Sequence, residues 1–353
     1  MNPRLALFSL LFAAGAVAAP LPKFPAGAVW NKDVSAPALK HPDSDRMIAW
    51  LQSHGGWGTG IDHFQIDFSM SVLHADANSP TAEMIGYPYD VYYFPDCDAP
   101  GTVPFPLPQG GSIEGSGDYT CDNENEDCHL LVVKGNELFE SYHSNRTSEG
   151  LQSQCAVRWD LSRVYPPQGR GEQCTSVDAA GFPVSALLFN ADEIYAAIQS
   201  QGDIGHAIRF ILPNDEMKAG EYVRPATHAG SPRSEDAYSI PYGSRLRLKA
   251  DFDIDAFSGN EAARALLRTL KKYGMVLADG GNVPLTAEVD TYTTHKWDEP
   301  AISFDSHSLF GIEPDDFEVV ATDAPIELTY DCVREPDGGG DPPPNPIFAS
   351  GFE

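Results

Sequence analysis

Positively charged residues are scarce in this chain of 353 residues. Lysine and arginine together number 23, against 51 aspartates and glutamates, and the formal net charge is −28. Such an excess of negative charge favours solubility and opposes binding to nucleic-acid phosphates or to anionic lipid surfaces. We therefore expect neither nucleic acid nor an anionic membrane surface as a partner.

Long apolar runs are also lacking, apart from one at the N-terminus. Residues 5–18 are apolar, follow the single charge of Arg4, and end on the small-x-small sequence Ala16-Val17-Ala18. This pattern is typical of a secretory signal peptide, and the run is shorter than the roughly 20 residues that cross a bilayer. We predict that residues 1–18 are a signal peptide, that the protein is secreted, either outside the cell or to the periplasm, and that no integral membrane span follows.

Several motifs of well-known enzyme classes are absent. The sequence has no Gly-x-Ser-x-Gly segment, which excludes the nucleophile elbow of an α/β-hydrolase. It has no Gly-x-x-x-x-Gly-Lys phosphate-binding loop. It also lacks Cys-x-x-Cys and His-x-x-x-His spacings, which makes a structural zinc site a weak alternative.

The chain does contain six cysteines, all beyond the predicted signal peptide. An even number of cysteines in an exported protein predicts disulfides, here three, although six cysteines allow 15 pairings. We favour one tight loop and one of medium length, which leaves a third pair by elimination. These pairs are Cys121–Cys128, Cys155–Cys174 and Cys97–Cys332.

Short apolar runs typical of strands dominate the chain. They cover residues 90–94, 129–133, 137–142, 156–161, 207–212, 245–250, 275–278 and 317–321. Helices are expected after Asp43, over residues 191–201, and over residues 260–273, where Ser258 is the expected cap and Gly274 the end. We predict a β-rich α+β fold, an antiparallel sandwich or distorted barrel with two or three peripheral helices and long loops.

Four segments together resemble an uncharacterised family of secreted bacterial β-rich proteins. They are residues 129–133 (HLLVV), 175–181 (TSVDAAG), 225–228 (PATH) and 245–249 (RLRLK). The resemblance implies one contiguous domain and assigns no reaction. We expect a single domain over residues 19–335 that begins with an extended arm, 19–42.

The last 18 residues, 336–353, are predicted to be a Gly/Pro linker followed by a short C-terminal tail. The ending IFASGFE is similar to short endings of other secreted bacterial proteins. Association with the cell surface through this tail is therefore an alternative to free secretion.

Two carboxylates are the first candidates for catalysis. Asp178 lies among small residues in the TSVDAAG segment, and Glu193 follows at the start of a predicted helix. Carboxylates held on different elements can divide into the acid and base of glycoside hydrolysis. His228, on a predicted loop, and Asp279, at a strand end, are expected to assist. The alternative is that Asp178 caps a turn and Glu193 favours its helix N-terminus.

A second set of candidates suits substrate binding. Arg245, Arg247 and Lys249 alternate with leucines and share one strand face, which predicts a groove for carboxylates such as uronic acids. Pairing of these cations with acidic neighbours is the alternative. Further expected substrate contacts come from one aromatic, one histidine and one arginine side chain. These are Trp159, His206 and Arg209, the last two on opposite faces of their strand.

Calcium is the cofactor that remains open, although no residue is assigned as a metal ligand. Asp251, Asp253 and Asp255 alternate on a predicted strand, and the loop 121–128 is rich in acidic residues. Neither segment has the spacing of an EF-hand loop. Other oxygen and nitrogen donors with low specificity are Asp62, His63, Asp67, His74 and Asp76.

The favoured hypothesis is a secreted polysaccharide-degrading enzyme, with glycoside hydrolase preferred to polysaccharide lyase. Export, a loop-rich β body and the polar residues between 175 and 280 motivate it. The first alternative is a non-catalytic carbohydrate-binding or surface-interaction protein. The second is a metal-dependent secreted enzyme that uses His206, His228 or His74 together with carboxylates.

Overall fold

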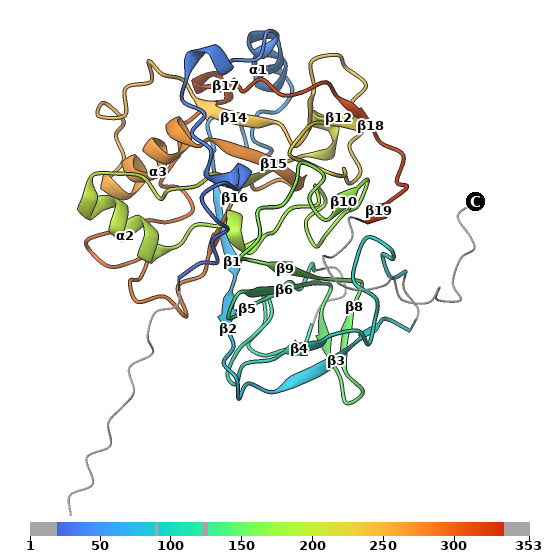
Figure 1. Cartoon of the computed structure of the whole chain (residues 1–353). Helices are drawn as coiled ribbons and strands as arrows, with labels where there is room; N and C mark the ends of the chain where they lie inside the picture. Colours follow the sequence, from blue (N-terminus) through green and yellow to red (C-terminus); the bar gives the residue numbers. More distant parts are fainter. Residues whose placement is uncertain (1–19, 89–90, 122–125, 335–353) are drawn as a thin grey trace, which may run out of the picture.

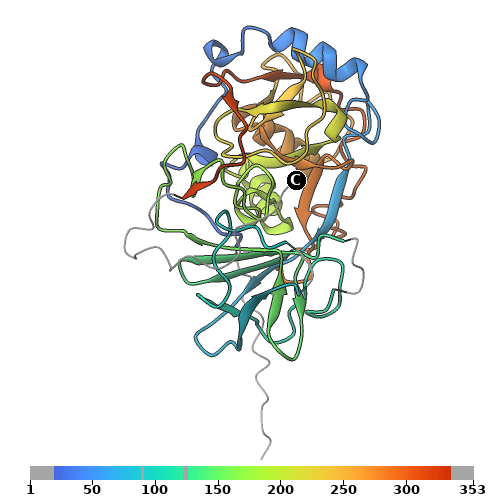
Figure 2. The ribbon, with the colours of Figure 1, turned by 90° about the vertical axis from the view of Figure 1, so that its right-hand side faces the viewer.

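The computed structural model describes residues 20–88, 91–121 and 126–334. These residues form an α+β structure with more strand than helix, and none of the sheets they build closes into a barrel. A larger part that carries the helices lies above a smaller part made of strands (Figures 1 and 2). The β-rich α+β prediction is therefore confirmed in its sandwich form. The single domain stays a prediction.

The larger part is built on a six-stranded sheet. Its order is β1 (Ile66–Met70), β16 (Leu285–Glu288), β11 (Ile208–Leu212), β15 (Met275–Gly280), β14 (Arg245–Leu248) and β17 (Phe317–Val319). The β1–β16 and β11–β15 pairs are parallel, and the remaining pairs are antiparallel. The two central strands, β11 and β15, are apolar and largely buried, as expected of strands covered on both faces.

Three helices cover this sheet. They are α1 (Ser44–Ser53), α2 (Ala191–Ser200) and α3 (Glu261–Lys272). In α3 the leucines Leu266, Leu267 and Leu270 are fully buried and pack toward the sheet, and Gly274 follows its end with a positive φ of 67°. The N-cap is Asn260, whose side chain accepts a hydrogen bond from the Ala263 amide at 3.0 Å. The expectation that Ser258 is the cap was wrong.

The smaller part is a sandwich of two four-stranded sheets. One sheet has the order β2 (Val72–His74), β5 (Leu130–Lys134), β6 (Glu137–Tyr142), β9 (Cys155–Asp160). The other has the order β4 (Pro104–Pro106), β3 (Thr81–Gly86), β8 (Leu151–Ser153), β7 (Asn145–Arg146).

The β5 strand shows why the first of these sheets is buried on both faces. Leu130 and Val132 pack into the core between the two sheets of the sandwich. Leu131 and Val133 point the opposite way, toward residues 177–188 and the N-terminal arm. The unbroken apolar run HLLVV thus joins the sandwich to the larger part.

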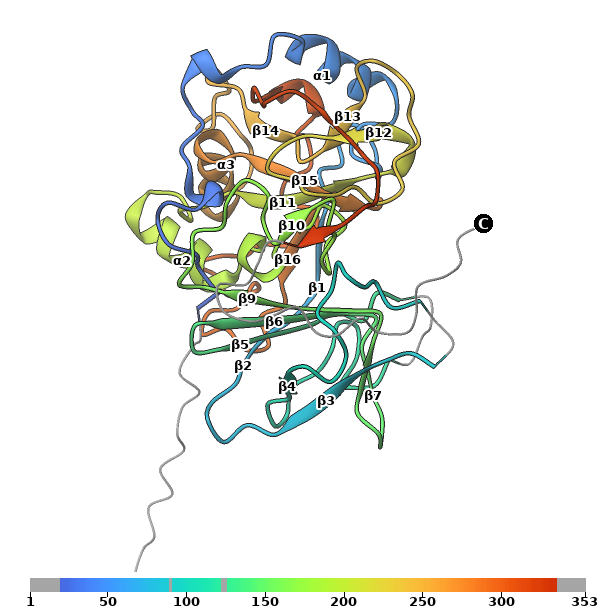
Figure 3. The same cartoon turned by 45° about the vertical axis from the view of Figure 1, so that its right-hand side comes forward.

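One segment connects the two parts directly. Strand β1 ends at Met70 and β2 begins at Val72, so that only Ser71 separates a strand of the upper sheet from a strand of the lower one. Two small sheets lie to one side: β13 (Ile240–Tyr242), β12 (Met217–Tyr222), β18 (Ile326–Glu327), and the pair β10 (Gly171–Glu172) and β19 (Val333–Arg334). The β10–β19 pair lies where the two parts meet (Figure 3).

Short 3₁₀ turns complete the chain. They are η1 (Val29–Asn31), η2 (Pro37–Leu39), η3 (Ser185–Leu187), η4 (Asn214–Glu216) and η5 (Pro314–Asp316). Residues 251–255 and residues 91–94 are outside any strand. The predicted strand over residues 90–94 and the alternating carboxylate face over 251–255 were therefore wrong.

Three disulfides are present. Cys121–Cys128 is confirmed, whereas the other two pairs are Cys97–Cys155 and Cys174–Cys332. The favoured pair Cys155–Cys174 and the pair left by elimination, Cys97–Cys332, were both wrong, because loop length alone does not say which cysteines the sheets bring together. Cys155 opens β9 beside the 95–98 loop, and Cys332 precedes β19.

Two predicted features lie outside the described residues, namely the signal peptide at 1–18 and the tail at 336–353. Most of the acidic loop between Cys121 and Cys128 does so as well. None of the helices in the described part of the chain combines the length and the apolar character that a bilayer crossing requires.

Candidate functional site

A buried ion pair lies at the centre of the candidate site. Asp178 has no solvent exposure, and it accepts hydrogen bonds from Arg209 Nε at 3.1 Å and Nη2 at 3.2 Å. Arg209 comes from β11, and its Nη1 donates to Thr286 Oγ1 at 3.1 Å. Burial raises the pKa of Asp178, and the guanidinium opposes that shift. Both carboxylate oxygens are occupied, so Asp178 anchors the TSVDAAG segment to the sheet.

Asp279 lies beside this pair, near the end of β15. Its Oδ2 accepts a hydrogen bond from the Ala179 amide at 3.2 Å, and its Oδ1 accepts one from the Gly280 amide at 2.7 Å. Burial and the charge of Asp178 raise the pKa of Asp279 to about 7, and Arg209 opposes the shift. A carboxyl group with this pKa is present in both its protonated and its ionised form at neutral pH.

His228 contacts the other backbone group of Ala179, its carbonyl. Its Nδ1 is 2.9 Å from the Ala179 carbonyl oxygen and donates to it. Burial lowers the pKa of His228, whereas the Ala179 carbonyl, Asp96 and Asp279 all oppose that shift. Asp279 and His228 thus bond the amide and the carbonyl of one residue, Ala179. The structure therefore brings together four of the predicted residues, Asp178, Arg209, His228 and Asp279.

His129 links these residues to an open hollow of about 290 Å³, because its ring contacts both the Val177 carbonyl beside Asp178 and Glu114, which lines the hollow. The hollow is lined by Ser69, Glu114, Gly115, Glu126 and Asp127, and three of these five residues are acidic. Glu114 is the carboxylate on its inner wall and is 15% exposed. The hollow thus presents oxygen ligands and negative charge, and no cation is among its lining residues.

Glu114 is held in its ionised form by neighbours. His129 Nδ1 donates to Glu114 Oε2 at 2.7 Å, and Ser69 Oγ lies 2.6 Å from Glu114 Oε1. Burial alone raises the pKa of Glu114, but the His129 charge and these hydrogen bonds lower it to about 2. Burial likewise opposes the charge of His129, and Glu114 reverses that effect and raises the pKa of His129 to about 9.

The side chains of Tyr142 and Arg209 each interact electrostatically with Asp279 and with one acidic residue of the hollow. Burial raises the pKa of Tyr142, and the nearby charges of Asp127, which lines the hollow, and of Asp279 raise it further. Burial opposes the charge of Arg209, but Asp178, Asp279 and Glu114 together raise its pKa. Asp279 and Glu114 therefore share one neighbour, Arg209, and belong to one electrostatic environment.

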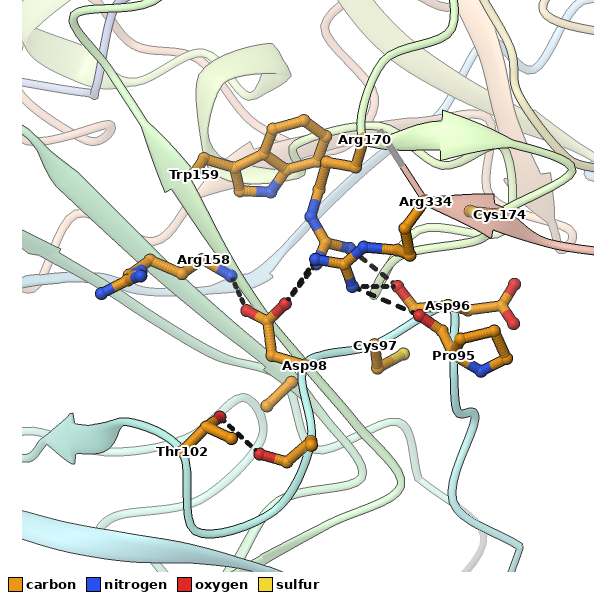
Figure 4. Close-up of polar contacts among 12 residues, drawn as sticks. Pro95, Asp96, Cys97, Asp98, Thr102, Arg158, Trp159, Arg170, Cys174 and Arg334 are labelled. Atoms are coloured by element: carbon orange, nitrogen blue, oxygen red, sulfur yellow. Dashed lines mark hydrogen bonds and ion pairs between the residues drawn. The ribbon is translucent and has the colours of Figure 1, made fainter. Parts of the chain in front are cut away.

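The loop that carries Asp96 is fixed by a separate network. Asp98 accepts hydrogen bonds from Arg170 Nη2 at 2.6 Å and from Arg334 Nη2 at 2.9 Å, and both guanidinium groups also donate to the Asp96 carbonyl. The Asp96 carboxylate points away from these arginines (Figure 4). It accepts a hydrogen bond from the Thr175 amide at 2.8 Å instead. The network therefore orients Asp96 toward the segment that carries Asp178 and Ala179.

Glu193 belongs to a different group of residues. Its Oε1 lies 2.9 Å from Lys23 Nζ, and its Oε2 lies 3.4 Å from His206 Nε2, at the start of α2. His206 Nδ1 donates to the Ala207 carbonyl. Glu193 thus ties the N-terminal arm to α2, and the predicted acid/base pairing of Asp178 with Glu193 does not describe the site. His206 and Arg209 have different partners, as strand alternation predicts.

The predicted cationic groove was wrong. Arg245 is 5% exposed and donates to the backbone carbonyls of Tyr273 and Val29, at 2.6 and 3.1 Å, which ties the arm to the sheet. Arg247 pairs with Glu318 and also donates to backbone carbonyls of the arm. Lys249 bonds the Asp315 carbonyl. These three cationic side chains therefore bind groups of the protein itself.

Trp159 also has an internal role. It is 2% exposed, and its Nε1 donates to the buried Glu140 at 3.0 Å. The guanidinium of Arg170 lies over its ring. Trp159 is therefore a core residue of β9 that packs toward the larger part, and its predicted contact with substrate has no support in this arrangement.

Glu126 and Asp127 of the hollow belong to the acidic loop 121–128 that the sequence offered as a possible calcium site, whereas Ser69 and Glu114 were missed, although weak signals for them exist. Asp67 and Ser69 are two residues apart on β1, which places them on one face of the strand. Glu114 lies in a glycine-rich loop between Gly111 and Gly115, a typical position for binding residues. Asp67 was considered only as a metal ligand. Within the described ranges no cluster of three or more metal-binding side chains occurs, and bound calcium stays a prediction.

Comparisons of the chain with protein-family models, with curated proteins and with solved structures each found no match. The resemblance to secreted bacterial proteins therefore stays a prediction.

Proposed function

We propose that the protein is a secreted glycoside hydrolase in which Asp279 is the general acid and Glu114 the ionised carboxylate. Glycosidic bonds are commonly cleaved by two carboxyl groups, one that protonates the leaving oxygen and one that activates water or attacks the sugar. The observation that carries the proposal is that two carboxyl groups act on the same neighbour, Arg209, and differ in ionisation, with a pKa of about 7 for Asp279 and about 2 for Glu114. Such a difference assigns an acid and a base.

The hollow supports a small polar substrate. Its volume of about 290 Å³ is close to the lower limit of about 300 Å³ typical of ligand pockets. Its lining of Ser69, Glu114 and Asp127 offers acceptors for sugar hydroxyl groups. Three disulfides are consistent with an oxidising, extracellular location.

The charge of the site favours hydrolysis over lyase chemistry. A polysaccharide lyase acts next to a uronate carboxylate, which needs cations to neutralise it. The hollow is acidic, and the arginines of β14 are bound to groups of the protein itself. Neutral or basic sugars therefore fit this site better than uronic acids.

The proposal is tested by incubating the mature chain with a panel of polysaccharides and analysing the products by mass spectrometry. We expect shorter oligosaccharides from at least one neutral or basic polymer. Asp279→Asn and Glu114→Gln should each reduce the rate about 100-fold or more. Asp215→Asn, on an exposed side chain, is the matched control and should keep the wild-type rate.

Folding of each variant is checked by its thermal melting. If folded Asp279→Asn and Glu114→Gln variants cleave at the wild-type rate, the assignment is wrong. Binding of a glycan without cleavage by the wild-type chain supports the carbohydrate-binding alternative instead.

A further inference from the structure

Ser69 lies between two carboxyl groups. Its Oγ is 2.5 Å from Asp67 Oδ2 and 2.6 Å from Glu114 Oε1. A serine hydroxyl carries one proton, and an ionised carboxylate can only accept hydrogen bonds. With both carboxylates ionised, one of the two contacts would place oxygen lone pairs against each other. One of the carboxyl groups must therefore supply a second proton.

His129, on the opposite side of Glu114 from Ser69, also needs an additional proton. Its Nδ1 is 2.7 Å from Glu114 Oε2, and its Nε2 is 3.3 Å from the Val177 carbonyl oxygen. Both neighbours are acceptors. An imidazole donates from both nitrogens only when it is the cation. The His129 ring is therefore protonated at both positions in this arrangement.

We infer that Asp67, Ser69, Glu114 and His129 form one hydrogen-bonded chain that holds two protons more than ordinary ionisation at neutral pH provides. Asp67 is protonated and donates to Ser69. Ser69 donates to Glu114, which stays ionised, and the His129 cation donates to Glu114 from the other side. The three ionisable groups then carry no net charge, whereas ordinary ionisation would leave two negative charges.

The surroundings favour this location of the protons. Glu114 also accepts a hydrogen bond from the His129 amide at 3.3 Å, which stabilises its ionised form. Burial raises the pKa of Asp67 and so does the charge of Glu114, against the opposing effects of Ser69 and Arg209. The proton therefore belongs on Asp67.

Other charged groups face the chain from neighbouring elements. Asp127 raises the pKa of His129, and Arg209 lowers it. Asp178 interacts with the charge of His129 and is neutralised by Arg209. The positive charge of His129 is therefore balanced by nearby carboxylates, Glu114 and Asp127.

In the proposed hydrolase, a function that this role presupposes, the hydrogen-bonded chain makes Asp67 and Ser69 positioning residues. Glu114 receives hydrogen bonds on both oxygens, and these fix its orientation toward the hollow. They also keep it ionised at acid pH, where an isolated glutamate would be protonated.

The inference is tested without substrate, by NMR of the side-chain carboxyl carbons and imidazole nitrogens. In the wild-type chain at pH 6 we expect the Asp67 carboxyl to be protonated and the Glu114 carboxyl ionised. At pH 7.5 both nitrogens of His129 should carry protons. An ionised Asp67 at pH 6, or a neutral His129 at pH 7.5, would overturn the inference.

Variants then separate the members of the chain. Asp67→Asn replaces the protonated acid by an amide that also donates, so the signals of Glu114 and His129 should stay as in the wild type. Ser69→Ala removes a donor to Glu114 and should shift its titration to higher pH, and Ser69→Thr should restore it. Ser162→Ala is the control, because Ser162 bonds a single exposed carboxylate, Asp160, at 2.6 Å.

These spectra remain informative if no glycan is cleaved, so failure of the proposed function and failure of the proton chain are distinguished. If cleavage is found, Ser69→Ala should move the acid limb of the pH–rate profile to higher pH, and Ser69→Thr should not. An acid limb that stays in place in Ser69→Ala, while the Glu114 titration shifts, would contradict the assignment of Glu114 as the ionised partner.

Discussion

Asp178 and Arg209 meet through two hydrogen bonds inside the protein, and neither side chain is more than 5% exposed. This pair joins the loop of residues 175–181 to the central strand β11, and the charges of Asp279 and Glu114 both raise the pKa of its Arg209. The stability of the fold and the ionisation of the candidate site are thus coupled at one contact.

Arg209→Leu should destabilise the protein strongly, because it leaves the buried Asp178 without a counter-charge. Removing one partner of a buried ion pair costs about 3–5 kcal/mol. Urea unfolding at pH 7 measures the loss. Arg233→Leu, which removes an exposed partner of Asp215, should change the midpoint little. Equal losses in the two variants would contradict the role of the buried pair.

Glu216→Gln should increase stability at alkaline pH. The Glu216 side chain is 5% exposed, its Oε2 has no hydrogen-bond partner among the described residues, and burial raises its pKa from the ordinary value of 4.5 to about 8. In the unfolded chain Glu216 ionises near pH 4.5, but in the folded chain it stays protonated up to about pH 8. The stability that Glu216 contributes at low pH is therefore lost as the pH rises between these values.

We expect the Gln variant to match the wild type near pH 4 and to exceed it by about 2–4 kcal/mol at pH 8. Chemical denaturation across this pH range gives the two curves. Glu235→Gln, at an exposed position, serves as the control and should follow the wild type throughout. Parallel curves for Glu216→Gln and the wild type would show that the carboxyl is solvated.

The two disulfides that close the largest and smallest loops should differ in their effect. Cys174–Cys332 joins residues 158 apart, and Cys121–Cys128 joins residues 7 apart. The entropy of loop closure then predicts losses of roughly 5 and roughly 2 kcal/mol when each pair is replaced by serines. Calorimetry of the two double variants tests the order. Limited proteolysis should show early cleavage near β18 and β19 only in the Cys174/Cys332 variant.

Arg245→Met should loosen the N-terminal arm and leave substrate binding intact. The guanidinium bonds to Val29 and Lys32 carbonyls are lost, and each such bond contributes about 1 kcal/mol. Proteolysis within residues 29–34 should accelerate. If the variant instead lost affinity for an anionic glycan with the arm still protected, the carboxylate-binding role of this strand would be restored.

The proposed hydrolysis should decline as the pH rises through about 7. Asp279 is the proton donor, and its pKa of about 7 means that the acid form disappears above that value. A pH–rate profile of the wild type measures this limb. Tyr142→Phe removes a neighbour of Asp279 without removing a carboxyl group, and it should keep the limb within the same range. An alkaline limb well above pH 8 would assign the donor to another group.

Much of the fold followed from local patterns in the sequence. The span of α3 was predicted from its leucine stripe and from Gly274, and β6 was predicted from an apolar run with the same ends, Glu137 and Tyr142. Such signals depend on residues a few positions apart, where periodicity and turn chemistry are decisive. The cap of α3 was missed because Ser258 and Asn260 are both good caps.

The site was only half predictable. Asp178, Arg209, His228 and Asp279 were singled out one by one, and the structure brings them together. Ser69, Glu114 and His129 come from three segments up to 60 residues apart, and only the pairing of β1 and β5 with their sheets makes them neighbours. The arginines of β14 were predicted to line a groove because alternation places them on one face of the strand. Alternation does not show that the N-terminal arm covers that face.

The single residue between β1 and β2 has a mechanical consequence. Because only Ser71 separates β1 from β2, the upper sheet and the lower sandwich are joined by a very short connection. Ser69 lies two positions before Ser71. A rotation of one part relative to the other would pull on Ser69 and change its distances to Asp67 and Glu114. A molecule that binds between the two parts and separates them would therefore also change where the protons of Asp67 and Ser69 lie.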